Sequence, residues 1–223
     1  LDNKMINKSE LNSMKIENIW LEFQKQFDLS DDQISKFKIY FDMLIANNEL
    51  FNITAITSLQ EVVKDHFSDS LYISNFIDFK KINYICDVGS GGGFPGIPLK
   101  IKYPHLQVCL IEVTGKKIAF LRNVIQNLGL DNAQIYTNDW KTFLRKTDYP
   151  IDLFCARASL QPEDLVRVFS PAFAYNKTDL VYWASQLYVP GEKVLKYVQK
   201  QEEYMIGRKT RKLVFFKNNP EVA

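Results

Sequence analysis

The residue types that most directly indicate a chemistry lie in a glycine-rich segment at residues 87–96. It reads Asp87-Val88-Gly89-Ser90-Gly91-Gly92-Gly93-Phe94-Pro95-Gly96 and follows a short apolar run that predicts a strand. Glycines there let the backbone turn sharply and approach a ligand closely. Glu112 ends the next predicted strand, where a carboxylate can accept hydrogen bonds from both hydroxyls of a ribose. The segment therefore predicts a cofactor that contains a nucleoside.

Two classes of cofactor fit the glycine spacing. Gly91, Gly93 and Gly96 satisfy the G-x-G-x-x-G pattern of dinucleotide sites, where a pyrophosphate lies at a helix N-terminus. Gly89, Gly91 and Gly93, led by an acidic residue, instead give D-x-G-x-G-x-G, a spacing typical of S-adenosylmethionine sites. Asp87 favours the second class, because a carboxylate facing the loop repels a pyrophosphate but tolerates a sulfonium and organises contacts to the methionine ammonium. The alternative function is that of an NAD-dependent oxidoreductase. The alternative without any function is a glycine-rich turn that binds no ligand.

Asp139 and Trp140 are further cofactor candidates, because they directly follow the third predicted strand. A carboxylate there can accept a hydrogen bond from an adenine amino group, while neighbouring apolar atoms cover the ring. The structural alternative is an aspartate N-cap beside a core tryptophan, and both interpretations can hold together.

The elements around these residues alternate between strand and helix. Strands are predicted at residues 84–88, 108–111, 133–137, 151–156 and 180–184, separated by helical stretches at 116–128, 140–146, 162–173 and 192–201. Such alternation predicts a parallel sheet with helices on both faces, a Rossmann-like α/β fold. We expect residues 204–206 and 212–217 to form a terminal hairpin through Gly207.

An N-terminal helical part precedes this pattern. Residues 14–77 are predicted to be helical, with Ser30 and Gln33 forming a capping box and Asn47-Asn48 ending a helix. We expect residues 1–78 to form a helical segment packed on the core and residues 79–223 to form the Rossmann-like domain. His66 and Asp69 share one helix face, either as a structural hydrogen-bonded pair or near the mouth of an active site.

Composition restricts the class of protein further. The 223 residues carry a net charge of +2, too small to indicate nucleic-acid binding unless cations cluster locally. No apolar run reaches the ~18 residues of a membrane span, and residues 1–10 lack the apolar core of a signal peptide. Cys86, Cys109 and Cys155 lie apart in apolar runs, so we expect core residues, no metal site and a cytoplasmic location.

With the loop extended to Leu99, the sequence resembles the bacterial 16S ribosomal RNA guanine-N7 methyltransferases, also called glucose-inhibited division protein B. Phe94-Pro95-Gly96-Ile97-Pro98-Leu99 matches the F/L-P-G-I-P-L of that family, and the likeness covers about residues 30–217. The other matching segments are Asn52-Ile53-Thr54, His66-Phe67-Ser68-Asp69-Ser70-Leu71, Gly115-Lys116-Lys117-Ile118-Ala119-Phe120-Leu121-Arg122 and Arg157-Ala158. A basic residue usually precedes the family's histidine, and here the residue is Asp65.

The resemblance implies a class I S-adenosylmethionine methyltransferase sheet with an N-terminal helical appendage. It implies S-adenosylmethionine as cofactor and 16S ribosomal RNA, or the small ribosomal subunit, as partner. The cofactor-binding residues would be Asp87, Gly89, Ser90, Gly91, Gly93, Phe94, Glu112, Asp139, Trp140, Lys141 and Arg157.

Arg157 is also the catalytic candidate, since it ends the fourth predicted strand, where ligands of such folds gather. It would orient the guanine by hydrogen bonds to O6 or by stacking, and the structural alternative is an arginine bonded to a carboxylate. Guanine N7 carries a lone pair and no proton, so methylation needs no general base.

Backbone contacts to RNA would come from clustered cations. The candidates are Lys116, Lys117, Arg122, Arg208, Lys209, Arg211 and Lys212. The alternative for each cluster is a solvated surface, and the alternative for the whole chain is a non-catalytic RNA-binding relic of the fold. We expect a monomer. Naked RNA and an assembled particle both remain open as the substrate.

Overall fold

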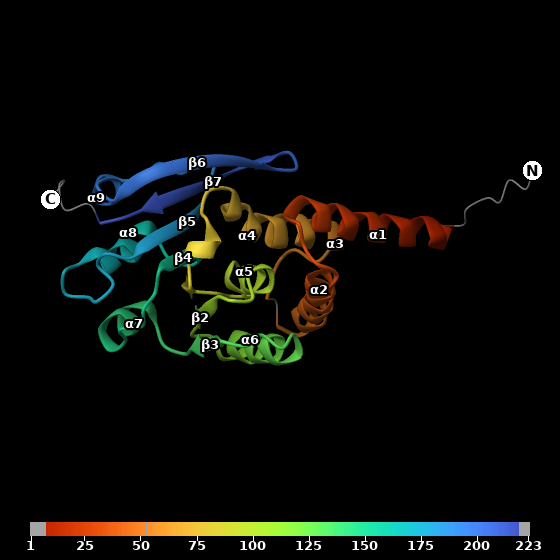
Figure 1. Ribbon diagram of the computed structural model, residues 1–223, viewed down its shortest axis with the longest axis horizontal. Helices are drawn as coiled ribbons and strands as arrows, with labels where there is room; N and C mark the ends of the chain where they lie inside the picture. Colours follow the sequence, from red (N-terminus) through yellow and green to blue (C-terminus); the bar gives the residue numbers. More distant parts are fainter. Residues whose placement is uncertain (1–7, 52, 219–223) are drawn as a thin grey trace, which may run out of the picture.

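A seven-stranded sheet forms the centre of the molecule in the computed structural model, which describes residues 8–51 and 53–218 (Figure 1). Its order is β3-β2-β1-β4-β5-β7-β6. The first five strands are parallel, and β7 pairs antiparallel with both β5 and β6. The strands are β1 (Tyr84–Val88), β2 (Gln107–Ile111), β3 (Ala133–Tyr136), β4 (Leu153–Arg157), β5 (Asp179–Ser185), β6 (Val198–Ile206) and β7 (Lys209–Phe216). The predicted α/β fold is confirmed, while Asn52 and residues 1–7 lie outside the described residues.

Helices cover both faces of the sheet (Figure 1). The N-terminal ones are α1 (Lys8–Phe27), α2 (Asp31–Phe51), α3 (Leu59–Val62), a π-helix (Val63–Ser68), α4 (Asp69–Leu71) and 3₁₀ turns at Tyr72–Asn75 and Phe79–Lys81. The later ones are α5 (Gly96–Lys102), α6 (Gly115–Asn127), α7 (Trp140–Lys146), α8 (Pro162–Leu165), a 3₁₀ turn at Val166–Phe169, and α9 (Glu192–Leu195).

Alternate residues of each strand enter different hydrophobic clusters, as the period of a strand requires. In β4, Cys155 belongs to the cluster that includes the N-terminal helices, α5 and α6, whereas Phe154 belongs to the cluster under α7 and α8. In β7, Leu213 and Val214 divide in the same way. We call these the first face and the second face of the sheet.

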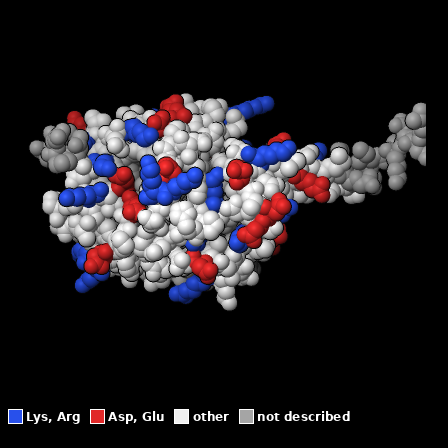
Figure 2. All heavy atoms as spheres, viewed as in Figure 1, with Lys and Arg blue, Asp and Glu red and all other residues white. Residues whose placement is uncertain are grey.

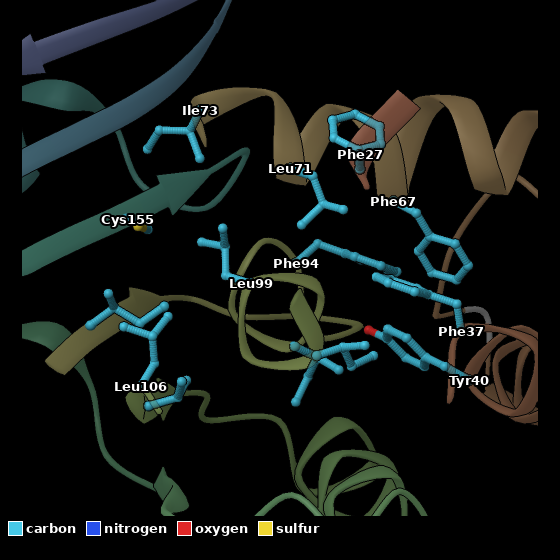
Figure 3. Packing of buried hydrophobic residues seen from close by; sticks show 14 of the residues in the cluster. Phe27, Phe37, Tyr40, Phe67, Leu71, Ile73, Phe94, Leu99, Leu106 and Cys155 are labelled. Carbon is cyan, nitrogen blue, oxygen red and sulfur yellow. The ribbon is translucent and has the colours of Figure 1, made fainter. Parts of the chain in front are cut away.

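The N-terminal helices share one core with the first face. Phe67 of the π-helix lies 5.0 Å from the ring of Phe37, 5.3 Å from Tyr40 and 6.1 Å from Phe94 of the glycine loop (Figure 3). The predicted capping box of α2 is confirmed, because Ser30 N donates to Gln33 Oε1 and Gln33 N donates to Ser30 Oγ. These contacts place helix residues beside the loop. The domain boundary at residues 78 and 79 stays a prediction.

Three element predictions are wrong in their bounds. Asn47-Asn48 does not end a helix, because α2 runs through to Phe51 and Leu44 is fully buried, which outweighs the small propensity cost of asparagine. The helix predicted at 162–173 is one α-helical turn followed by one 3₁₀ turn that ends at Phe169. The helix predicted at 192–201 is a single turn, and residues 198–201 belong to β6. The backbone of that polar stretch pairs with β7, and its side-chain pattern does not predict this pairing.

The core position predicted for the cysteines agrees with the structure. The three cysteines are buried and free, and no group of residues within the described part could hold a metal ion. None of the helices described is long and apolar enough to cross a membrane.

Candidate functional site

A cavity of about 300 Å³ opens at the carboxyl ends of β1, β2 and β4. This is the edge where open α/β sheets bind ligands. Of the predicted cofactor residues, Gly89, Glu112, Asp139 and Trp140 line it, and so does Lys117, a predicted RNA-binding residue. The remaining lining residues are Val88, Ile111, Val113, Ala158, Ser159 and Leu160. We refer to this space as the cofactor cavity.

The glycine loop reaches the cavity through backbone that only glycine adopts easily. Gly89, Gly91 and Gly93 have φ angles of 71°, 59° and 97°. A Cβ on Gly89 would lie 2.5 Å from the Cβ of Ser159. A Cβ on Gly93 would lie 2.7 Å from Ile97 and from the hydroxyl of Tyr40, which donates to the carbonyl of Gly92 (Figure 3). The loop is therefore held between the β4 edge and helix α2.

Glu112 fastens the loop to the start of α6. Its Oε2 accepts a hydrogen bond from Gly91 N at 2.9 Å, and Oε1 accepts from Val113 N at 2.9 Å and Thr114 N at 2.8 Å. A carboxylate has about four acceptor positions, so the side chain keeps room for one more donor. Because Glu112 also lines the cavity, that position is available to a ribose hydroxyl.

Asp87 lies behind the loop rather than in the cavity lining. The residue is fully buried, and its Oδ2 accepts from Gly96 N at 3.0 Å. Burial raises the pKa of this carboxyl to about 7. Oδ1 is buried and has no partner within the described part of the chain. Ser90 Oγ donates to the Asp87 carbonyl and closes the turn. Ser90, Gly91, Gly93 and Phe94, like Asp87, are not among the residues that line the cavity.

Asp139 and Trp140 satisfy the structural interpretation and still line the cavity. Asp139 caps α7, since its Oδ1 accepts from Thr142 N at 2.8 Å. Trp140 is buried, and its Nε1 donates to the carbonyl of Asp164 at 3.0 Å. Lys141 is exposed in the first turn of α7 and does not line the cavity.

Arg157, at the end of β4, is the centre of a second arrangement. Its Nη1 donates to Asp69 Oδ2 at 3.0 Å and to the carbonyl of Asp65 at 3.2 Å, and its Nη2 donates to His66 Nδ1 at 3.1 Å. The guanidinium also lies 5.0 Å from the ring of Phe94. Arg157 therefore bonds a carboxylate, as the structural alternative expects, and joins the sheet to the π-helix. We call Arg157, Asp65, His66, Asp69 and Tyr204 the Arg157 cluster.

His66 is a neutral acceptor in this cluster. Since Nδ1 accepts from Arg157, the ring proton is on Nε2, which donates to Thr54 Oγ1 at 2.8 Å. Burial, with a smaller effect of the Arg157 charge, lowers the pKa of His66 to about 3. The ring stacks on Phe94 at 4.6 Å. Both ring nitrogens are thus engaged.

Asp69 and Asp65 connect the cluster to the terminal hairpin. Asp69 Oδ1 accepts from the hydroxyl of Tyr204 in β6 at 2.8 Å, and its carbonyl accepts from Trp183 Nε1 at 3.0 Å. Asp65 Oδ2 accepts from Lys209 Nζ at 2.8 Å. Tyr204, Trp183 and Tyr40 were missed by sequence reasoning, because each occurs in a stretch whose pattern indicates only core. Thr54 belongs to a segment that matches the family, but its bond to His66 was not predicted.

The predicted RNA-binding cations have different surroundings. Lys209 is paired with Asp65, and Lys212 contacts the carbonyl of Tyr188 at 3.3 Å and Glu203 at 3.6 Å. Arg208 is exposed beside the turn at Gly207. In α6, Lys116 and Arg122 are exposed while Lys117 is half-buried. Figure 2 shows Lys and Arg interspersed with Asp and Glu on the face that it displays, so no uniform basic surface is visible there.

Comparison with known proteins gives two kinds of similarity. Residues 33–216 match the family described as rRNA small subunit methyltransferase G. Ribosomal RNA small subunit methyltransferase G of Listeria monocytogenes is 38% identical over 165 residues, 73% of this chain and 69% of that protein. The Bacillus subtilis protein of the same name is 39% identical over 137 residues, 60% of this chain and 57% of that one.

Solved structures support the fold alone. A mitomycin 7-O-methyltransferase is similar with a TM-score of 0.52 at 16% identity, covering 80% of this chain and 60% of that one. A human methyltransferase 10 domain containing protein is similar with a TM-score of 0.51 at 15% identity, covering 66% and 77%.

Proposed function

The chain belongs to the rRNA small subunit methyltransferase G family, and we propose that it methylates N7 of a guanine in 16S ribosomal RNA of the small subunit. The observation that carries the proposal is the family match over residues 33–216, which includes both the glycine loop and the Arg157 cluster. The match favours the D-x-G-x-G-x-G interpretation over the dinucleotide one. The protein is an S-adenosylmethionine-dependent methyltransferase.

The cofactor cavity suits the donor by its chemistry. When bound, S-adenosylmethionine supplies an electrophilic methyl carbon on a sulfonium. Glu112 has an acceptor position free for a ribose hydroxyl, and Asp139 and Trp140 line the part of the cavity after β3. Asp87 Oδ1, buried without a described partner, places an unsatisfied carboxyl oxygen behind the loop. We propose that the glycine loop, Ser90, Phe94 and Lys141 complete this site.

The reaction asks the protein to position the guanine rather than to remove a proton. His66, the histidine nearest to Arg157, has both nitrogens bonded and a pKa lowered to about 3, so it is unsuited as a base. That agrees with an N7 nucleophile, which carries no proton. Holding two reacting groups in line is the larger source of rate in such a reaction.

We assign Arg157 to orienting the target guanine. Its guanidinium is fixed by Asp69, His66 and the stack on Phe94, so its plane has a defined direction at the end of β4. A fixed planar cation can stack on a base or donate to guanine O6.

Backbone binding to RNA is assigned to Lys116, Lys117, Arg122, Arg208, Lys209, Arg211 and Lys212. Because phosphate contacts release counterions, we expect binding that weakens steeply with salt. Action as a monomer in the cytoplasm belongs to the same proposal.

The test is transfer of a tritiated methyl group to small ribosomal subunits that lack the modification, followed by nucleoside analysis. We expect 7-methylguanosine from the wild-type chain. Arg157→Ala should lower the rate of methyl transfer by about 100-fold, because the guanine is then misplaced relative to the methyl carbon. The affinity of this variant for S-adenosylhomocysteine should stay near that of wild type. A wild-type chain that binds S-adenosylhomocysteine but transfers no methyl group would be the non-catalytic relic. An Arg157→Ala rate equal to wild type would remove Arg157 from the mechanism.

A further inference from the structure

Arg211 lies on the same face and the same edge of the sheet as Arg157. Odd-numbered residues of β7 face the N-terminal helices, as Leu213 and Phe215 do in the first-face cluster. Arg211 continues that series, and Lys209, one step further, reaches Asp65 of the π-helix. Lys212 belongs to the opposite face with Val214. Of these neighbouring cations, Arg211 therefore shares its face with Arg157.

The register fixes how far apart the two arginines lie. Arg157 of β4 is paired with Trp183 of β5, and Arg211 of β7 is paired with Ser185 of β5. Two strand spacings across and two residues along the sheet give a Cα separation of about 12 Å. Ser185, which has a small side chain, lies on β5, the strand between β4 and β7. The two cations thus lie on either side of β5 at the carboxyl edge of the sheet.

Arg211 has none of the partners that hold Arg157. Its Nε is sealed from solvent without a hydrogen-bond acceptor, and no carboxylate within the described residues pairs with its guanidinium. Its charge still reaches the cluster, since it lowers the pKa of His66 together with the larger effects of burial and Arg157. Lys209 and Lys212, by contrast, already contact Asp65 and Glu203. A half-buried arginine without a counter-ion has donors free for a further acceptor. The planar guanidinium can donate two parallel hydrogen bonds to the oxygens of a phosphate.

We propose that Arg211 binds a phosphodiester of the RNA next to the target nucleotide, while Arg157 positions the base. This inference rests on the proposed function, and it separates Arg211 from the other cations of the hairpin. The phosphate would accept hydrogen bonds from the Arg211 guanidinium at the carboxyl edge of the first face. The small side chain of Ser185 would leave room there for the phosphate.

The experiment measures binding of a short fluorescent oligouridylate, which has phosphates but no target guanine, over a series of salt concentrations. Arg211→Gln should bind about tenfold more weakly at low salt and lower the slope of log affinity against log salt by about one unit. Arg145→Gln is the matched control, because Arg145 is exposed in the last turn of α7, far along the helix from the carboxyl edge. It should keep the wild-type slope. Arg211→Lys should retain most of the slope, since it keeps the charge.

Two outcomes would overturn the inference. One is an Arg211→Gln protein whose affinity and slope equal those of wild type. The other is an equal weakening in Arg211→Gln and Arg211→Lys together with failure to bind S-adenosylhomocysteine, which would make Arg211 a structural residue only. Failure of the proposed function is distinct, because it would appear as a wild-type chain that binds oligouridylate normally but methylates no ribosomal subunit.

Discussion

The cofactor cavity takes its lining from short segments that directly follow strands, whereas the Arg157 cluster joins side chains from segments far apart in the chain. Glu112 of the cavity lining and Gly91, whose N–H it accepts, are 21 residues apart. Asp69 is 88 residues from Arg157 and 135 from Tyr204, and all three meet. One region depends on backbone conformation, and the other on buried charge. The two should therefore respond differently to the same kind of change.

The largest effect is expected from breaking the buried ion pair of the cluster. Asp69 and Arg157 have side chains only 6% and 13% exposed, so Asp69→Asn leaves a buried cation without its counter-ion. We expect a loss of about 3–5 kcal/mol in the free energy of unfolding, since removal of one partner of such pairs costs that much. Thermal and urea denaturation measure it.

Asp32→Asn is the matched control for this prediction. Asp32 pairs with Lys36 at 2.7 Å but is 72% exposed, so its loss should cost less than about 1 kcal/mol. Equal costs for the two substitutions would show that the Arg157 cluster is no more than a surface ion pair.

The two regions should also have opposite pH dependence. The pKa of Asp87 is raised to about 7, so the stability from this group falls as pH rises from about 4 to about 7. The pKa of His66 is lowered to about 3, so its contribution falls as pH drops from about 6.5 to about 3. Each contribution is at most about 5 kcal/mol, from shifts of somewhat more than three pKa units.

Urea denaturation at several pH values would test this opposition. The difference between wild type and Asp87→Asn should change between pH 4 and 7, and the difference between wild type and His66→Asn should change below pH 6.5. Curves that stay parallel in these windows would mean that neither group is held as the structure shows.

A substitution in the glycine loop should act on the cavity rather than on the cluster. Alanine at Gly89 would place a Cβ 2.5 Å from the Cβ of Ser159, at a φ of 71°. Either Gly89 or residues 158–160 must then shift, and all of these residues line the cavity. We expect affinity for S-adenosylhomocysteine, measured by calorimetry, to fall about 100-fold, roughly 3 kcal/mol.

Gly129→Ala separates steric displacement from backbone strain. Gly129 has a φ of 58° but no atom within 4 Å of an added Cβ, so this variant should lose about 1 kcal/mol of stability and keep its affinity. If both alanines weaken binding alike, the close approach to Ser159 is not what shapes the cavity.

The difference between the two regions also explains what could be predicted from the sequence. The order of strands and helices, the loop glycines and Glu112 follow from local patterns, because each motif directly follows a strand. Tyr204 and Trp183 could not be predicted, since their polar atoms meet Asp69 only after β5 and β6 have paired with β7. The strand at 198–201 was missed because its polar side chains carry no strand pattern, and it is defined only by its pairing with residues 214–216 across the hairpin.

Lys117 is the residue at which sequence and structure indicate different ligands, and it offers the smallest but sharpest test. The sequence groups it with the RNA-binding cations, whereas the structure places it in the wall of the cofactor cavity. S-adenosylmethionine carries one more positive charge than S-adenosylhomocysteine, so a nearby ammonium disfavours the donor relative to the product. Lys117→Gln should therefore lower the ratio of donor to product dissociation constants about two- to threefold, about 0.5 kcal/mol for a partly screened charge. Calorimetry with both ligands gives this ratio, in which interactions common to the two ligands cancel. Lys116→Gln is the control, because Lys116 does not line the cavity and its substitution should leave the ratio unchanged. If Lys117→Gln leaves this ratio constant but reduces the salt dependence of RNA binding, Lys117 belongs with the RNA-binding cations. The cofactor-binding residues would then be confined to the segments that the glycine motif predicts.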